Sequence, residues 1–115
     1  MVLSQCGRPE LTTELMTERE LQDAIVTAAR LGGWLHYHTY DSRRSQPGFP
    51  DLVLVHPHRG ETVFWECKSA SGRVTDPQHA WLDALTGSGQ RAEVIRPADL
   101  DSAIDYLIQP RRKEP

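Results

Sequence analysis

The chain has 115 residues, of which 38% are hydrophobic and 25% charged, and its net charge is −3. This length suits one ordinary domain, and the composition is globular rather than disordered or fibrous. The acidic balance excludes a strongly basic nucleic-acid coat, although it leaves room for a local basic patch. No apolar run reaches the roughly 20 residues of a membrane span, residues 1–7 do not resemble a signal peptide, and two cysteines make no disulfide framework. We therefore expect an intracellular protein.

The first convincing element is a helix that begins after Thr17. Residues 1–16 carry no clear pattern and are expected to form an N-terminal arm. Thr17 can cap a helix, and Glu20 stands three residues later, as in a capping box. Apolar residues then recur at helical spacing until Gly32 and Gly33, which are typical of a helix end.

A β-rich stretch follows the first helix. Residues 34–40 are aromatic and β-prone and predict a strand. Residues 41–50 have no apolar period and predict a loop, whose length in so small a domain hints at function. Residues 51–55 predict a buried strand, and residues 61–69 predict another. The turn over residues 56–60 makes these two strands a hairpin.

The second half returns to helices. Asp76 as N-cap and Pro77 at the first helical position predict a helix that ends near Gly87. Residues 92–96 predict a short strand, and Pro97 starts a last helix. The order is helix, three strands, helix, strand, helix.

This order combines a hairpin with helix-linked strands, so we expect an α/β fold with a mixed central β-sheet flanked by helices. The domain is expected to span residues 17–108. Residues 109–115 are expected to form a charged tail.

The strand over residues 61–69 carries an unusual pair of charges. Side chains at i and i+2 face the same way, so Glu66 and Lys68 project together, about 7 Å apart along the strand. Phe64 shares their face, whereas Cys67 points the other way and is most simply a small core residue. A buried charge needs a partner. The pair therefore either forms an ordinary salt bridge with an exposed lysine or belongs to a site.

Asp51 opens the neighbouring strand directly after Pro50. If the hairpin forms, Asp51 and Glu66 converge at the open end of the sheet. Two hard oxygen ligands suit Mg²⁺ or Mn²⁺. Lys68 beside them can position or deprotonate a water and stabilise negative charge. Such a site suits hydrolysis of a phosphodiester.

Pro50-Asp51 followed by Glu66-Cys67-Lys68 resembles the PD-(D/E)XK nuclease superfamily and, more narrowly, the VRR-NUC family of small nucleases. The resemblance covers roughly residues 17–108. The further matching pieces are residues 18–22, Gly48, Phe49, Leu52, Phe64, Trp65, Gly72, Arg73, Gln78, Trp81 and Leu82. It implies a restriction-endonuclease-like α-β-β-β-α-β core and metal-dependent DNA cleavage. For the stand-alone phage and bacterial type it implies homodimers that cut branched DNA such as four-way junctions.

The resemblance also implies an acidic residue on the first helix beside the metal. Glu18 borders the apolar face and Glu20 turns toward water, so we assign Glu18 to the site and Glu20 to the cap, with two solvated acids as the alternative. Gln22 lies on the same edge as Glu18. By the same resemblance, Gln78 orients a water or phosphate rather than being an ordinary exposed residue, and the Cys67 backbone carbonyl offers a third metal ligand.

Basic residues near the carboxylates are candidates for DNA binding. Arg43, Arg44 and Arg73 lie in loops that flank the site and can contact phosphates without reading bases; solvated loop arginines are the alternative. His38 is a further candidate phosphate contact. His36 and His38 share a strand face, but no further ligand stands at the spacing of a zinc site.

Together these features predict a Mg²⁺- or Mn²⁺-dependent DNA endonuclease, selective for branched DNA and homodimeric, in the cytoplasm of a bacterial or phage-infected cell. The main alternative is a non-catalytic DNA-structure-binding protein with the same fold. A hydrolase of small phosphoesters is a weaker one, because it needs an enclosed pocket.

Overall fold

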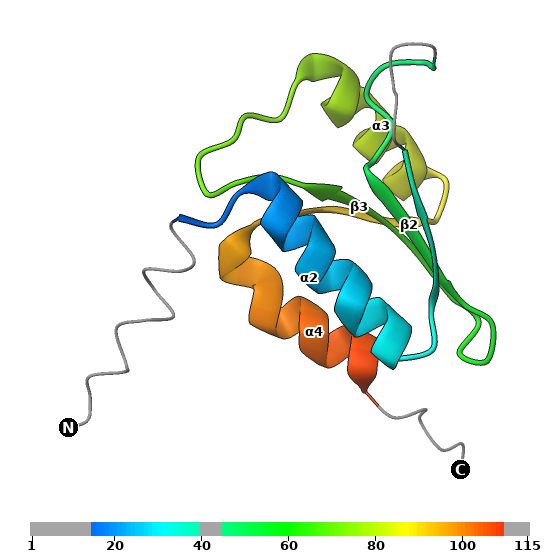
Figure 1. Ribbon diagram of the computed structural model, residues 1–115. Helices are drawn as coiled ribbons and strands as arrows, with labels where there is room; N and C mark the ends of the chain where they lie inside the picture. Colours follow the sequence, from blue (N-terminus) through cyan, green and yellow to red (C-terminus); the bar gives the residue numbers. More distant parts are fainter. Residues whose placement is uncertain (1–14, 40–44, 110–115) are drawn as a thin grey trace.

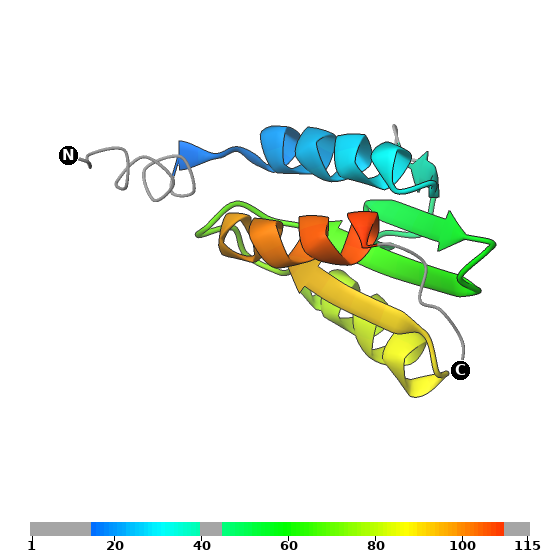
Figure 2. The ribbon, with the colours of Figure 1, turned by 90° about the horizontal axis from the view of Figure 1, so that it is seen from below.

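A computed structural model describes residues 15–39 and 45–109. A four-stranded sheet carries α2 and α4 on one face and α3 on the other (Figures 1 and 2). The elements are α2 (Glu18–Leu31), β1 (Leu35–His38), β2 (Leu52–His56), β3 (Glu61–Cys67), α3 (Asp76–Gly87), β4 (Arg91–Ile95), the 3₁₀ turn η3 (Pro97–Asp99) and α4 (Leu100–Ile108). None of these described helices is long and apolar enough to cross a membrane.

The sheet has the spatial order β1-β2-β3-β4 and is mixed, as predicted. β1 pairs antiparallel with β2, and β2 pairs antiparallel with β3, so the expected hairpin is confirmed. β4 returns parallel to β3 after α3 and places Val94 beside Glu66. A parallel return needs a crossover, and α3 supplies it. The α/β class with helices on both faces follows from this topology.

The N-terminal end of α2 forms as the sequence predicts. The Thr17 hydroxyl accepts a hydrogen bond from the Glu20 backbone N–H, and the Glu20 carboxylate accepts one from the Thr17 N–H, each 3.0 Å long. The capping box thereby satisfies two backbone donors at the start of the helix. Leu21 and Ile25 follow on the buried face.

The core lies between the sheet and the helix pair α2 and α4. Its fully buried side chains include Trp65, the largest, together with residues from every layer on that side. They are Leu21, Ile25, Ala29, Leu52, Leu54, Val63, Cys67 and Leu107. The alternation along β2 and β3 therefore sends one set of side chains to this core and the other set toward α3.

Trp34 corrects the expected strand over residues 34–40. β1 covers Leu35–His38, because Trp34 is buried in the core instead of pairing in the sheet, and Tyr40 lies outside the described residues. Its indole N–H donates to the Leu107 carbonyl oxygen at 2.8 Å and so joins the C-terminal end of α2 to the end of α4. This contact spans 73 residues of sequence.

His56 corrects the expected turn over residues 56–60. It is the last residue of β2 and is buried. One ring nitrogen lies 2.9 Å from the Gly32 carbonyl oxygen, and the other lies 3.2 Å from the Arg59 backbone nitrogen. Both nitrogens are therefore satisfied by the backbone, and only the residues after His56 form the turn.

The start of α3 differs by one residue from the prediction. Thr75, not Asp76, is the N-cap, and Pro77 stands one position further into the helix than expected. The Thr75 hydroxyl accepts from the Gln78 backbone N–H at 3.3 Å, while the Gln78 side-chain oxygen accepts from the Thr75 N–H at 2.9 Å. This reciprocal pair outweighs a cap by Asp76, which satisfies neither donor. Pro97 likewise begins a 3₁₀ turn rather than the last helix itself.

Candidate active site

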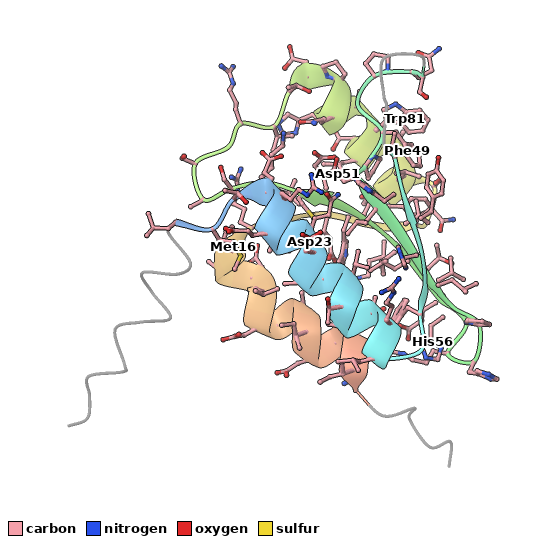
Figure 3. All side chains as sticks on the ribbon, in the orientation of Figure 1. Met16, Asp23, Phe49, Asp51, His56 and Trp81 are labelled. Carbon is pink, nitrogen blue, oxygen red and sulfur yellow. The ribbon has the colours of Figure 1, made fainter. Side chains whose placement is uncertain are left out.

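The hairpin brings Asp51 and Glu66 to the same end of the sheet. Asp51 directly precedes β2, and its Oδ2 accepts a hydrogen bond from the Cys67 backbone N–H at 3.0 Å. This bond ties the Asp51 side chain to the end of β3. Figure 3 shows Asp51 between α2 and α3 at this end of the sheet. The predicted convergence of the two carboxylates is confirmed.

Glu66 is the buried centre of the cluster, with 2% of its surface exposed. Its Oε2 accepts a hydrogen bond from the Gln78 side-chain amide at 3.0 Å and lies 3.7 Å from the Lys68 Nζ. Within the described residues, Glu66 Oε1 is a buried side-chain oxygen with no hydrogen-bond partner. Such an atom is costly to bury, so this point is where a cation would be accommodated.

The electrostatics of Glu66 agree with this geometry. Burial, and then the negative charge of Asp51, raise the pKa of Glu66 to about 8, although the Lys68 ammonium opposes them. Two carboxylates this close do not ionise together without a compensating charge. The Lys68 ammonium does not bring the pKa of Glu66 back to its ordinary value. The site therefore fits a divalent cation.

Lys68 is buried, so it is not the exposed lysine of an ordinary surface salt bridge. It stands just after β3, and its backbone N–H donates to the Ile95 carbonyl oxygen at 3.0 Å, which continues the pairing with β4. Its side chain shares a face with Glu66 and Phe64, as predicted. That face turns toward α3, where Phe49 stacks edge-on between Phe64 and Trp81 (Figure 3).

Cys67 points to the opposite face and is a core residue, as predicted. Burial, followed by the negative charges of Asp51 and Glu66, raises the pKa of the Cys67 thiol far above its ordinary value. The thiol therefore stays protonated and is no nucleophile. What Cys67 brings to the cluster is its backbone, whose N–H holds Asp51.

Gln78 joins α3 to the cluster with one side chain. Its oxygen caps the helix through Thr75, and its amide group donates to Glu66. The sequence signal for the cap was present in Thr-Asp-Pro-Gln, which fits the capping-box pattern. The bond to Glu66 depends on the docking of α3 against β3 and has no local signal.

Glu18 and Glu20 separate as predicted. Glu20 is engaged in the capping box, whereas Glu18 lies over the loop that follows β3. A Cβ added at Gly72 would stand 3.2 Å from a Glu18 carboxylate oxygen. The role of Glu18 in the site stays a prediction, because Glu18 is exposed.

Arg96 is a residue that sequence reasoning missed. Its guanidinium donates to the carbonyl oxygens of Ser69 and Gly72, each at 2.8 Å, and so fixes the loop after Lys68. Both contacts cross more than 20 residues of sequence, so no local pattern reveals them. Arg73 lies in the same loop and is exposed.

The other basic candidates are placed differently. Arg43 and Arg44 lie outside the described residues. His38 pairs with Leu52, the residue after Asp51, but its side chain turns to the α2 face of the sheet, whereas Glu66 turns to the α3 face. His36, His38 and Gln22 line a groove between α2 and β1. In the described part of the chain, no three His, Cys, Asp or Glu side chains gather closely enough to hold a metal ion together.

Helices on both faces of a mixed sheet, with two acids and a lysine at the end of its hairpin, define the restriction-endonuclease-like class of α/β proteins. The family model of the VRR-NUC domain matches residues 5–99, so the chain belongs to the VRR-NUC family.

Two solved structures share this fold. A solved VRR-NUC domain superposes with a TM-score of 0.65 at 22% identity, covering 78% of this chain and 97% of that one. A second, described as a VRR-NUC domain protein, gives 0.56 at 18% identity, with coverages of 82% and 87%. These similarities concern the fold.

Two curated relatives align with about half of the chain. The Fanconi-associated nuclease 1 homolog of Caenorhabditis elegans is 37% identical over 62 residues, which is 54% of this chain and 7% of that protein. The homolog of Schizosaccharomyces pombe is 36% identical over 56 residues, or 49% of this chain and 8% of that protein. The chain thus matches only a small part of these much longer proteins.

Proposed function

We propose that the chain is a metal-dependent DNA endonuclease that hydrolyses phosphodiester bonds. The observation that carries the proposal is the unpartnered buried oxygen of Glu66, beside a second carboxylate and a lysine. A protein that only binds DNA gains nothing from two carboxylates, because they repel phosphates. Membership in the VRR-NUC family and similarity to proteins named as nucleases support the same activity.

Asp51 and Glu66 would hold Mg²⁺ or Mn²⁺, with the Cys67 backbone carbonyl as a further ligand. Carboxylate and carbonyl oxygens are the donors that these hard cations prefer. When bound, such an ion supplies charge neutralisation at the phosphate and lowers the pKa of a coordinated water. The hydrogen bond from the Cys67 N–H fixes Asp51 for this task.

The remaining residues act on water and phosphate. Lys68 orients the attacking water and stabilises the negative charge that develops at phosphorus. Gln78 holds Glu66 in place and orients a water or a phosphate oxygen. Glu18 completes the site from α2. Hydrolysis adds water across one P–O bond, so the leaving oxygen receives a proton and the phosphate keeps the new oxygen.

We further propose that the protein is a homodimer that prefers branched DNA such as four-way junctions. One site cuts one strand, and symmetric cutting requires two sites related by a twofold axis. Edge strand β1 offers a contact surface, because Leu35 and Tyr37 are 66% and 62% exposed on the sheet face away from α2. Arg43, Arg44 and Arg73 are proposed phosphate contacts around the site.

Cleavage of labelled junction, flap and linear DNA with Mg²⁺, Mn²⁺ or EDTA tests the activity. Asp51→Asn removes one charge yet keeps an oxygen that can accept from the Cys67 N–H. Lys68→Met keeps most of the side-chain volume. We expect each to lower the rate by about 100-fold or more, while the exposed Asp83→Asn of α3 leaves it unchanged. Undiminished cleavage by Asp51→Asn would refute the proposal, and metal-independent binding without cleavage would favour the DNA-binding alternative.

A further inference from the structure

A basic groove runs along the side of the molecule next to the site. It has a volume of about 490 Å³ and lies between α2 and edge strand β1. Its lining includes two arginines, two histidines and one acid, which are Arg19, Arg30, His36, His38 and Asp23. The chain as a whole carries a net charge of −3, so the groove has a charge opposite to that of the molecule.

Helix geometry places the groove residues of α2 in one row. Arg19 and Arg30 are 11 residues apart, which returns to nearly the same side of an α-helix and spans about 16 Å along its axis. Asp23 lies on this side of α2, facing the strands in Figure 3. At a rise of about 3.4 Å per nucleotide in duplex DNA, this row matches about five nucleotides.

The opposite wall comes from β1. His36 and His38 pair with Leu54 and Leu52, whose side chains are buried on the α2 face of the sheet. Both histidines therefore face α2 across the groove. β1 is the edge strand, so no further strand of the described sheet closes this side.

One end of the groove lies near the residues that precede and follow the candidate site in sequence. Arg19 directly follows Glu18, and the partner of His38 on β2 is the residue after Asp51. The Thr39 backbone N–H also donates to the Asp51 carbonyl oxygen, 3.4 Å away. The groove therefore ends beside the strand ends that carry the site, but it lies on the α2 side of the sheet, whereas Glu66 contacts Gln78 on the α3 side.

We infer that this groove binds the phosphate backbone of the DNA strand that enters or leaves the active site, with Arg19 and Arg30 as its phosphate contacts and His36 and His38 on its second wall. The inference rests on the proposed nuclease function and adds a DNA-binding groove to it. Asp23 is the acid within this groove, so it opposes binding and limits its strength.

Two variants with opposite expected effects test the groove. Arg19→Gln with Arg30→Gln removes both phosphate contacts, so we expect affinity to fall by roughly 10-fold or more and the slope of log Kd against log salt to shrink by about 2. Asp23→Asn should instead tighten binding. Its control, Asp105→Asn on α4, makes the same charge change at an exposed position outside the groove and should leave affinity within about twofold of the original.

The measurement is fluorescence anisotropy of labelled duplex and four-way-junction DNA in EDTA, where no cleavage occurs, with circular dichroism to check folding. Unchanged affinity and salt slope in the double arginine variant would overturn the inference, as would equal effects of Asp23→Asn and Asp105→Asn. Cleavage is scored separately with metal. If the arginine variant binds DNA more weakly but no protein cleaves DNA with metal, the groove inference stands and the nuclease function is refuted. If cleavage occurs and the groove variants change neither binding nor cleavage, the nuclease function stands and the groove inference is refuted.

Discussion

Glu66 combines two features that together destabilise the metal-free protein. Its side chain is buried at the end of β3, yet one of its oxygens has no hydrogen-bond partner. Lys68 and Gln78 both approach the other oxygen, Oε2. The protein therefore keeps one acceptor of this carboxylate open, at a cost in stability that a bound cation would offset.

The raised pKa of Glu66 predicts a pH-dependent stability of the metal-free protein. The ordinary value is 4.5, and burial raises the pKa to about 8 in the folded state. Between these values the folded state keeps a proton that the unfolded state has lost, so stability falls as pH rises. We expect the free energy of unfolding to drop by about 1 to 3 kcal/mol between pH 5.5 and pH 8 in EDTA, measured by urea denaturation.

Glu66→Gln is the control, because its neutral amide cannot titrate and should remove this part of the slope. Added Mg²⁺ should stabilise the original protein more at pH 8 than at pH 5.5, since a metal ligand must be deprotonated. The same pH slope in both proteins would show that other groups cause it.

Strand alternation explains why the sequence predicts which sheet face these side chains share. The shared face of Glu66 and Lys68, and the core position of Cys67, follow from the period of two along β3. The approach of Gln78 to Glu66 does not, because it depends on how α3 docks. Arg96 was missed for the same reason, as its contacts with the loop after Lys68 come from a separate part of the chain.

At the scale of elements, the first turn of α3 connects helix stability to the site. The Gln78 side chain caps the helix through its oxygen and contacts Glu66 through its amide group. These two functions can be separated by substitution, because glutamate retains the oxygens but has no amide N–H to donate.

We predict different outcomes for Gln78→Ala and Gln78→Glu. Alanine loses the capping oxygen and should lower stability by about 1 kcal/mol. Glutamate keeps the acceptor for the Thr75 N–H and suits a helix N-terminus, but it repels Glu66. We therefore expect both variants to lose cleavage and alanine alone to lose the bond from the Thr75 N–H, measured as cleavage rate and thermal midpoint.

Thr75→Ser keeps the hydroxyl cap and serves as the control for both measurements. A Gln78→Glu variant that cleaves DNA like the original protein would contradict the proposed role of the amide group.

The elements themselves follow from local sequence patterns, whereas some of their boundaries depend on tertiary contacts. The mixed sheet, the hairpin and the α2 capping box follow from local patterns and are confirmed. The strand expected over residues 34–40 begins one residue later, because the indole of Trp34 bonds to Leu107 near the other end of the chain. The cap of α3 is one residue earlier than predicted, because Thr75 and Gln78 make two reciprocal bonds that Asp76 does not make.

At the scale of the whole molecule, the two faces of edge strand β1 differ. His36 and His38 turn toward α2 and form one wall of the basic groove. Leu35 and Tyr37 turn to the other face, where α3 packs near β4 at the opposite edge (Figure 2). Large exposed apolar side chains on an edge strand favour association with another chain. A dimer through Leu35 and Tyr37 would leave both grooves accessible to DNA.

The proposed homodimer therefore predicts that Leu35→Asp combined with Tyr37→Asp yields monomers. Light scattering coupled to gel filtration should give twice the 13.0 kDa chain mass for the original protein and 13.0 kDa for the variant, because four buried carboxylates cannot share an apolar contact. Ile108→Asp, which alters an exposed apolar residue of α4, should remain dimeric. The variant should also nick junction DNA without paired cuts, since each monomer carries one site. A 13.0 kDa mass for the original protein at all concentrations, or a dimeric double variant, would exclude this interface.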